Sequence, residues 1–579
     1  MKAGQYLIWG KVKMQTIIGI DLGTSTTEVA VIKDGKPVLL NNYDGNVITP
    51  SVVGVDESGN YIVGDRAKSQ LLLRPNSTIA EIKRKMGTDE KIRLDREVLS
   101  PIEISSKIIA YANRYASVAL EEEIKEAVIS VPAYFNEIQR RATVEAAEKA
   151  GLNVRRIINE PTAAALSYGL EHLEEESLVL VYDLGGGTFD VTLLEMFDGV
   201  LEVKASSGDN TLGGKDFDEC LMHYLIEQFE KRNKIHIGQD TYALAKLKEA
   251  AENCKIALSE RDSYTVHIPM LITKKGIPYS LEETVNIHQF EEMIQPYIER
   301  THLPIQTVLS DSKIAKEEID FVLLVGGSTR IPMISKDIEQ FLGIQPVHLV
   351  NPDYAVAEGA AIQGGIISGV IGQEDSIIMA DVNPFSLGVS ALTGLMDLRM
   401  SVIIPRNTTI PVTREEIYWT SYDNQEAADI RVYQGESIYP EENQFLGKFR
   451  IGDIPMGRVG KESIKVSFSY NLNGMLSVEA MILSTKKRAS IEIDLTGVTE
   501  KASIDVSEWT DHKLARSFRS IIRQAEKQIN QRKDIETVQL QKSVYELKKA
   551  IIQEEEEKAT EIQDMLLNEL EILEEERNQ

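Results

Sequence analysis

Two glycine-rich turns that begin with an aspartate carry the most informative chemistry in this 579-residue chain. They are DLGTST at 21–26 and DLGGGTFD at 183–190, and each follows an apolar run typical of a buried strand. Glycines let backbone N–H groups approach a phosphate closely, and threonine and serine hydroxyls add further donors. An aspartate at the end of the strand can hold a hydrated Mg²⁺. Two such turns, 162 residues apart, predict a duplicated domain that grips a nucleotide from both sides.

A third glycine turn, LLVGGSTRIP at 323–332, again follows a predicted strand. Its paired glycines could let the backbone lie against a nucleoside. The chain contains neither the G-x-x-x-x-G-K-[ST] string of a P-loop nor the G-x-G-x-x-G dinucleotide fingerprint. The predicted nucleotide site is therefore of another type.

Strands and helices that alternate from Met14 to about Gln373 are expected to position these turns. Near-continuous apolar strands followed by helices predict a mostly parallel sheet that is covered on both faces. The run QRRATVEAAEKAG at 139–151 is predicted to be a helix that ends at Gly151.

The pattern changes after a short apolar segment at 374–384. From 385 to about 498 apolar residues alternate with polar ones, and the run 463–481 predicts a hairpin that turns at Asn473-Gly474. Several such strands predict a compact β-sandwich. From about Val506 the pattern is helical, with apolar residues at three- and four-residue spacing. These are Ala559, Ile562, Leu566, Leu570 and Leu573.

Composition excludes several classes of protein. The formal net charge is −27, which argues against general nucleic-acid binding and against an anionic membrane surface as partner. Two cysteines, Cys220 and Cys254, are too few for a disulfide framework or a zinc site, which fits a cytoplasmic protein. No apolar run is long enough to span a bilayer. Residues 1–13 lack the features of a signal peptide and are interpreted as an N-terminal extension before Met14.

Longer strings resemble those of the 70-kDa heat-shock (DnaK-type) chaperones, within the superfamily of actin and the sugar kinases. The resemblance runs from about Thr16 to Val498. Its strings are IDLGTST (20–26), VPAYFNEIQRRAT (131–143), RIINEPTAAALSYGL (156–170), YDLGGGTFDVTLLE (182–195), LGGKDFD (212–218), EAAENCKIALS (249–259), LLVGGSTRIP (323–332) and NPDYAVAEGAAIQGG (351–365).

The resemblance implies a multidomain α/β and β protein. Its expected parts are the N-terminal extension (1–13), an actin-like (ribonuclease H-like) duplicated ATPase domain (14–373), an interdomain linker (374–381), a β-sandwich that binds peptides (382–504), and a short C-terminal helical lid (505–579).

The resemblance also implies roles in binding and hydrolysing ATP. Asp21, Asp183 and Asp190 would hold Mg²⁺ and flanking K⁺, mainly through water. Lys83, Glu160, Asp183 and Thr188 would act in hydrolysis. By residue type alone, Lys83 looks more like a surface lysine, since Arg84 and Lys85 follow it. The nucleotide would contact Gly23, Thr24, Ser25, Gly185, Gly186, Gly187, Thr188, Gly213, Gly214, Glu252, Lys255, Ser259, Gly326, Gly327, Ser328, Arg330 and Asp353.

Two further sets of residues are implied for communication and for peptide binding. Pro132, Arg140, Arg156, Asn159 and Asp381 would couple the nucleotide state to the linker, the second domain and a J-domain co-chaperone. Phe385, Val389, Leu392, Tyr418, Ser421, Ala428 and Ile430 would form the peptide site, with Leu392 and Ser421 arching over the peptide. Without the resemblance, these apolar residues would be ordinary sandwich core.

The chain departs from the family's pattern at the linker and the helical end. The apolar run Ile377–Ala380 replaces a valine- and leucine-rich one, and Ala428 replaces a bulkier valine. The family's latch aspartate is present as Asp423, but its arginine partner aligns with Val459, so Arg458 or Lys461 would have to substitute. Residues 551–579 carry eleven acidic and two basic side chains, a charge run that is usually a solvated helix face. The short helical end, the altered linker and Ala428 together favour a specialised form that resembles the short-lid HscC-like subgroup.

The sequence therefore predicts an ATP-dependent chaperone that binds and releases extended hydrophobic segments of unfolded proteins, with a nucleotide-exchange factor as a further partner. A specialised paralogue with few clients is the alternative within the family. A metabolite kinase on the same ATPase fold would not need the β-sandwich. An actin-like filament protein would lack everything after residue 374.

Overall fold

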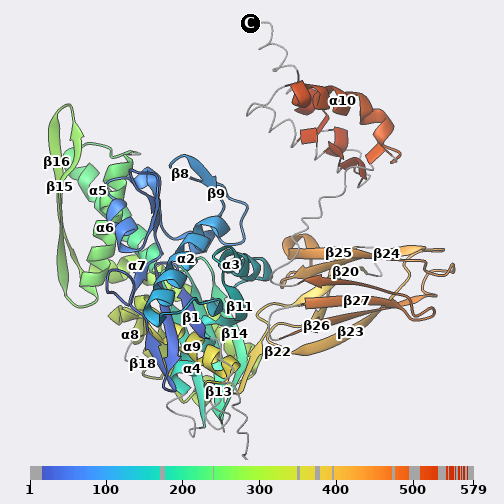
Figure 1. Ribbon diagram of the computed structural model, residues 1–579, viewed down its shortest axis with the longest axis horizontal. Helices are drawn as coiled ribbons and strands as arrows, with labels where there is room; N and C mark the ends of the chain where they lie inside the picture. Colours follow the sequence, from blue (N-terminus) through green and yellow to red (C-terminus); the bar gives the residue numbers. More distant parts are fainter. Residues whose placement is uncertain are drawn as a thin grey trace, which may run out of the picture. The chain divides into compact units, whose positions relative to one another are not determined.

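The fold is seen in a computed structural model (Figure 1). It describes residues 16–169, 176–197, 199–238, 240–348, 352–371, 378–393, 397–471, 476–493, 509–510, 512–531 and short pieces within 543–570. The expected N-terminal extension, residues 374–377 of the expected linker and the Asn473-Gly474 turn lie outside these residues. The chain separates into two compact units, residues 1–497 and 498–579.

A mixed sheet carries the first glycine turn. Its main path is β11-β10-β1-β2-β3, with β4 paired to β2. The strands are β1 (Ile17–Leu22), β2 (Thr26–Lys33), β3 (Lys36–Leu39), β4 (Thr49–Pro50), β10 (Glu126–Val131) and β11 (Asn153–Asn159). Strands β1, β10 and β11 are parallel, whereas β2 and β3 run antiparallel to their neighbours.

A second sheet repeats this arrangement around the second glycine turn. Its order is β18-β17-β12-β13-β14-β19-β22. The strands are β12 (Ser177–Leu184), β13 (Phe189–Phe197), β14 (Val200–Asp209), β17 (Phe321–Val325), β18 (Val347–His348), β19 (Ile378–Val382) and β22 (Thr409–Ile410). Again three neighbouring strands, β12, β17 and β18, are parallel, and the strand after the glycine turn returns antiparallel. Strand β19 is in turn parallel to β14.

The expectation of a mostly parallel sheet was therefore wrong. Each aspartate-glycine turn joins two paired strands directly, as in Asp21↔Glu28 and Asp183↔Asp190, with no helix between them. A connection this short allows only antiparallel pairing, because a parallel crossover needs a dozen or more residues. The duplicated domain itself is confirmed by the two repeated sheets.

Helices alternate with groups of strands along the chain. In the first half they are α1 (Asp65–Gln70), α2 (Pro101–Leu120), α3 (Glu137–Lys149) and α4 (Glu160–Gly169); in the second, α5 (Gly214–Asn233), α6 (Thr241–Leu258), α7 (Ile287–Ser312), α8 (Pro332–Leu342) and α9 (Ala355–Ser368). The predicted helix at 139–151 is α3, and Gly151 beyond its end has a φ of 85°. That left-handed conformation is the one glycine adopts at helix ends.

Smaller elements complete this part of the chain. They are β5 (Val53–Val55), β6 (Tyr61–Val63), β7 (Thr78–Ile79), β8 (Ile92–Leu94), β9 (Glu97–Leu99), and the short 3₁₀ turns η1 (Pro75–Ser77), η2 (Ile82–Lys85), η3 (Lys316–Glu318) and η4 (Gly327–Arg330). A long antiparallel hairpin, β15 (Ser263–Lys274) with β16 (Ile277–Asn286), extends beside α5 and α6 (Figure 1). No helix among the described residues has the length and apolar character to cross a bilayer.

Helix α9 meets α4 where Gly359 faces the Ala163 backbone. A Cβ added at Gly359 would lie 1.8 Å from the Ala163 carbonyl oxygen. We expect Gly359→Ala to lower the free energy of unfolding by about 2–3 kcal/mol, because the helices would have to move apart. Thermal denaturation checks this, with Gly452→Ala as control, since a Cβ there meets nothing within 4 Å. Equal losses for both variants would contradict it.

The expected β-sandwich is present. One sheet has the order β21-β20-β24-β25 and the other β23-β26-β27-β28. The strands are β20 (Leu387–Leu392), β21 (Leu398–Ile404), β23 (Val412–Trp419), β24 (Ala427–Gln434), β25 (Gln444–Gly452), β26 (Ser463–Tyr470), β27 (Leu476–Ile482) and β28 (Arg488–Ile493), with the turn η6 (Pro440–Glu442). The predicted hairpin is β26–β27, and its alternating apolar side chains are buried in the sandwich core.

The second unit is helical where it is described. Helix α10 (Ala515–Gln531) packs with later residues around a separate apolar core. Ala559, Leu566 and Leu570 are buried in this core, and Ile562 packs against it, as their spacing predicts. Leu573 lies outside the described residues.

Candidate functional site

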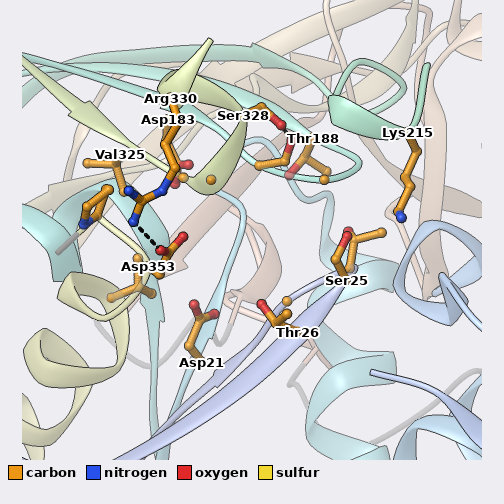
Figure 2. A pocket seen from close by; sticks show the side chains of 18 of the residues that line it. Asp21, Ser25, Thr26, Asp183, Thr188, Lys215, Val325, Ser328, Arg330 and Asp353 are labelled. Atoms are coloured by element: carbon orange, nitrogen blue, oxygen red, sulfur yellow. Dashed lines mark hydrogen bonds and ion pairs between the residues drawn. The ribbon is translucent and has the colours of Figure 1, made fainter. Parts of the chain in front are cut away.

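A cleft of about 690 Å³ lies between the two repeated sheets and is lined by all three glycine turns (Figure 2). Most of the predicted nucleotide-binding residues line it. These are Gly23, Thr24, Ser25, Gly185, Gly186, Thr188, Glu252, Lys255, Ser259, Gly326, Gly327, Ser328, Arg330 and Asp353. Asp21, Lys83, Glu160 and Asp183 also line the cleft. The duplicated turns therefore meet at one site.

The first two glycine turns face each other closely. A Cβ added at Gly186 would lie 2.2 Å from the Ser25 hydroxyl oxygen, and one at Gly187 would lie 2.8 Å from a Thr24 methyl carbon. Gly213 lies behind the second turn, where an added Cβ would meet the Gly187 backbone nitrogen at 2.5 Å. Glycine is needed at these positions so that the turns can approach, with their backbone N–H groups and hydroxyls available to phosphate oxygens.

Lys83 is buried beside these turns rather than exposed on the surface. Only 5% of its area is accessible, and its Nζ contacts a carboxylate oxygen of Glu160. Burial alone lowers the pKa of Lys83, but the carboxylates of Glu160, Asp21 and Asp183 outweigh it and raise that pKa. The ammonium group is therefore held charged inside the cleft. By contrast, Lys85 on the same turn forms an exposed ion pair with Glu90.

Acidic groups outnumber Lys83 at this end of the cleft. Burial raises the pKa of Glu160 to about 7, although Lys83 opposes the shift. Burial also raises the pKa of Asp183 well above its ordinary value, and the neighbouring Glu160 and Asp190 add to this. Asp190 is buried behind the cleft wall, and its Oδ2 has no hydrogen-bond partner among the described residues. Such a group of hard oxygen ligands fits Mg²⁺.

The opposite end of the cleft is lined by residues of α6 and of the third glycine turn. Glu252, Lys255 and Ser259 lie on one side of α6, as their spacing predicts. Gly326 has a φ of 84°, and a Cβ there would meet the Leu184 carbonyl oxygen at 2.5 Å. Arg330 and Asp353 form an ion pair of 2.5 Å, drawn dashed in Figure 2.

Four predicted residues do not line the cleft directly, and others were missed. Gly187, Gly213, Gly214 and Asp190 support the wall from behind. Missed residues that line it include Thr26, Glu28, Lys215, Ile256 and Val356. Glu28 could have been found, because a glutamate that leads directly into the apolar run of β2 is unusual in sequence. In the structure only 1% of its area is accessible, which is rare for glutamate.

Hydrogen bonds lead from the cleft to helix α3. Asp190 Oδ1 accepts the Tyr134 amide at 2.9 Å. Tyr134 lies in the turn after Pro132, whose carbonyl accepts the Phe135 amide. The Arg140 side chain donates to the Phe135 and Ala133 carbonyls at 3.1 and 3.0 Å. The segment around Pro132 is thus held between Asp190 and Arg140.

The same arginine leads on to the linker. Arg140 donates to the Asn159 side-chain oxygen at 2.6 Å, and Asn159 donates to Asp381 Oδ2 at 2.9 Å. Burial raises the pKa of Asp381, although Arg140 and Arg156 oppose the shift. Asp381 lies on β19, which pairs with β14 and with β22 in the second sheet. Four of the five predicted coupling residues are therefore joined through side chains or charge, with Pro132 in the adjoining turn.

The β-sandwich also contacts the nucleotide-cleft lobes directly. Arg406 donates twice to Asp311, at 2.7 and 2.9 Å. The Glu137 amide donates to the Gln434 side-chain oxygen at 3.0 Å. The Phe385 ring lies 4.4 Å from the Tyr134 ring. The Tyr134–Phe385 contact connects the turn beside Asp190 to the β-sandwich, and the other two contacts connect α7 and α3 to it.

The structure brings together only some of the predicted peptide-site residues. Val389 and Ile430 belong to one buried cluster, and Tyr418 and Ala428 pack against it. Leu392 is 46% exposed at the end of β20, and Ser421 lies in the loop after β23. Phe385 lies apart from this group, against Tyr134. The Asp423 side chain accepts a hydrogen bond from the Val459 backbone amide at 2.7 Å, which joins the loops that carry these two residues. Val459 occupies the position at which the family has the arginine partner of the latch aspartate.

Comparison with known proteins agrees with this architecture. The family model described as Hsp70 protein matches residues 17–95 and 89–579. The chaperone protein DnaK of Thermotoga neapolitana is 45% identical over 484 residues, which are 83% of this chain and 80% of the relative. The DnaK proteins of Thermotoga petrophila and Thermotoga maritima match at the same identity and coverage.

The chain belongs to the Hsp70 family.

This Hsp70 combines a duplicated, actin-like ATPase domain with a β-sandwich. Members of the family are ATP-dependent chaperones, so the predictions of family, fold class and ATPase activity are confirmed. Family membership also implies binding of ATP and ADP with Mg²⁺ and of unfolded polypeptides.

The charge of Asp190 should make this Hsp70 less stable at high pH when nucleotide and metal are absent. Burial raises the pKa of Asp190 from 3.8 to about 7, against the opposing Tyr134 amide. Ionisation of Asp190 is therefore harder in the folded state than in the unfolded state. The resulting contribution to the free energy of unfolding is complete below about pH 4 and is lost as the pH rises to about 7. We expect Asp190→Asn to raise the free energy of unfolding at pH 8 by about 2–4 kcal/mol.

Chemical denaturation of metal-free protein at pH 8 and pH 4.5 checks this expectation. The gain should be much smaller at pH 4.5, where the wild-type carboxyl is already neutral in the folded state. Asp453→Asn is the matched control, because Asp453 is exposed and paired with Lys487. An equal gain at both pH values would contradict a role for the Asp190 charge.

Proposed function

We propose that this Hsp70 couples the nucleotide state of the cleft to peptide release through the side chains between Asp190 and Asp381. The observation that supports this most directly is a route from Asp190 through the backbone of residues 133–135 to Arg140, and on through Asn159 to Asp381. It begins behind the phosphate turns and ends on β19. Packed groups with two discrete arrangements can carry coupling free energy between sites.

In the proposed mechanism, the two facing turns bind the phosphates, and Gly23, Thr24, Ser25 and Gly185–Thr188 supply amide and hydroxyl donors. Asp21, Asp183 and Asp190 would hold Mg²⁺ mainly through water, and the bound ion would neutralise phosphate charge; K⁺ is proposed beside it. Thr188 would lie by the terminal phosphate. Lys83 stabilises the charge that develops on that phosphate, and Glu160 and Asp183 position the attacking water.

The polypeptide site is proposed at the end of the sandwich where Leu392 and Ser421 lie. Val389, Tyr418, Ala428 and Ile430 would offer an apolar surface to one side chain, and an extended segment would add backbone hydrogen bonds. Asp381, Asn159 and Arg156 would also receive a J-domain co-chaperone, and an exchange factor would assist ADP release. We place this activity in the cytoplasm and in the response to stress.

Peptide release from the full chain tests the coupling. A fluorescent, extended apolar peptide is bound in ADP, and its dissociation is followed after adding ATP or more ADP. We expect ATP to speed dissociation at least tenfold, because ATP binding rearranges the contacts that begin at Asp190. Equal dissociation rates in the two nucleotides would overturn the proposed coupling.

A further inference from the structure

The turn that carries Lys83 is short and begins beside a residue with a strained backbone. η2 (Ile82–Lys85) is a 3₁₀ turn, whose hydrogen-bond geometry is poorer than that of an α-helix. Glu81, just before it, has a φ of 61° and a ψ of 27°, a left-handed conformation that is uncommon for residues other than glycine. Such strain persists only where surrounding contacts enforce it, and it is frequent at functional sites. Contacts from outside the turn must therefore hold it in place.

The side chain of Glu81 reaches from the first lobe to the second. Its carboxylate oxygen lies 2.6 Å from Nζ of Lys248, which belongs to α6. Ile82, next to Glu81, is buried in the apolar core of the first lobe, whereas Leu247, next to Lys248, is buried in that of the second. Burial alone raises the pKa of Glu81, but the attraction of Lys248 outweighs it and lowers that pKa. The Glu81 side chain is only 16% exposed, so this interlobe pair is screened less than a surface pair.

Arg84 attaches the other side of the same turn to the second lobe. Its Nη2 lies 2.6 Å from Asp216 Oδ2, in the first turn of α5. Its Nε donates a hydrogen bond of 3.3 Å to the Gly187 carbonyl of the second glycine turn. Lys83 lies between Glu81 and Arg84 in the chain. The turn is therefore held to the second lobe on both sides of Lys83.

We propose that the Glu81–Lys248 ion pair is a positioning contact for ATP hydrolysis, which fixes the turn that carries Lys83 against the second lobe and so places the Lys83 ammonium group at the phosphate end of the cleft. This inference rests on the role of Lys83 in hydrolysis proposed above. Neither Glu81 nor Lys248 lines the cleft, so the pair acts through Lys83 rather than on the nucleotide. Positioning of this kind has large effects, because displacing a reacting group by about 1 Å can cost about 10²-fold in rate.

A double-mutant cycle on the full chain tests the pair. Hydrolysis of prebound ATP is measured in a single turnover, and the dissociation constant of ADP is measured by equilibrium titration. We expect Glu81→Gln and Lys248→Met each to lower the hydrolysis rate about tenfold, but the affinity for ADP less than about threefold. The double variant should lose little more than either single variant. Lys246→Met is the matched control on α6, because Lys246 donates to the Met270 carbonyl within the second lobe, and its hydrolysis rate should stay at the wild-type value.

The outcomes separate this positioning contact from the role of Lys83 itself. Wild-type hydrolysis in the Lys248→Met variant, or additive losses in the double variant, overturns the positioning contact alone. A loss of ADP affinity as large as the loss of hydrolysis also overturns it, because the pair would then only hold the two lobes together. Wild-type hydrolysis in a Lys83→Met variant overturns both the role of Lys83 and this inference. Thermal melting checks that Lys248→Met is folded, as expected for a side chain that is 46% exposed.

Discussion

Replacing Lys83 with methionine is expected to lower the rate of ATP hydrolysis about 10²–10³-fold, as removal of one preorganised charge-stabilising group does in other enzymes. Lys83 is the buried base among the carboxylates at the phosphate end of the cleft, and its charge is maintained by Glu160, Asp21 and Asp183. Hydrolysis of prebound ATP in a single turnover measures the loss, because this assay excludes nucleotide exchange.

The structure offers a matched control on the same turn. Lys85→Met removes an equal charge, but Lys85 is exposed and paired only with Glu90, so the hydrolysis rate should stay within about twofold. Equal losses for the two variants would show that net charge near the cleft, rather than the buried ammonium, controls the rate.

Loss of Lys83 also affects stability, and a second variant separates the two effects. The Lys83→Met variant leaves Glu160 buried without its partner, which is expected to cost about 3–5 kcal/mol of unfolding free energy where Glu160 is ionised. Adding Glu160→Gln should restore much of this stability and none of the activity. Recovery of hydrolysis in the double variant would argue that Lys83 only offsets the charge of Glu160.

The sequence could predict the cleft because its signals are local. A strand, a glycine turn and a returning strand lie within one short segment, and the direct contact of Gly186 with Ser25 explains why both turns are rich in small residues. The hairpin β26–β27 was equally predictable, because alternation over two short runs fixes both its register and its buried face.

Other features depend on contacts between distant segments. Lys83 resembles a surface lysine until Glu160, 77 residues later, is placed against it. The mixed pairing of each sheet depends on which strands the hairpins join, and apolar periodicity does not reveal this. Phe385 has the residue type of a peptide pocket, but its contact with Tyr134 depends on how the β-sandwich meets the first lobe.

Replacing Asp381 with asparagine is expected to abolish most of the effect of ATP on peptide release, reducing the acceleration at least tenfold. Asp381 is 7% exposed, accepts the Asn159 side chain and the Val382 amide, and opposes the charges of Arg140 and Arg156. Asparagine keeps the shape but removes this charge, so β19 should be held less firmly by the first lobe. Dissociation of a fluorescent peptide after ATP addition measures the effect.

Asn159→Ala should act at the same step, because Asn159 is the link between Arg140 and Asp381. If both residues belong to one route, the double variant should lose little more than either single variant, whereas independent sites would give additive losses. Single-turnover hydrolysis should change less than peptide release, since Asp381 does not line the cleft. Additive losses in release, or a loss of hydrolysis as large as the loss of release, would contradict the route from Asp190 to Asp381.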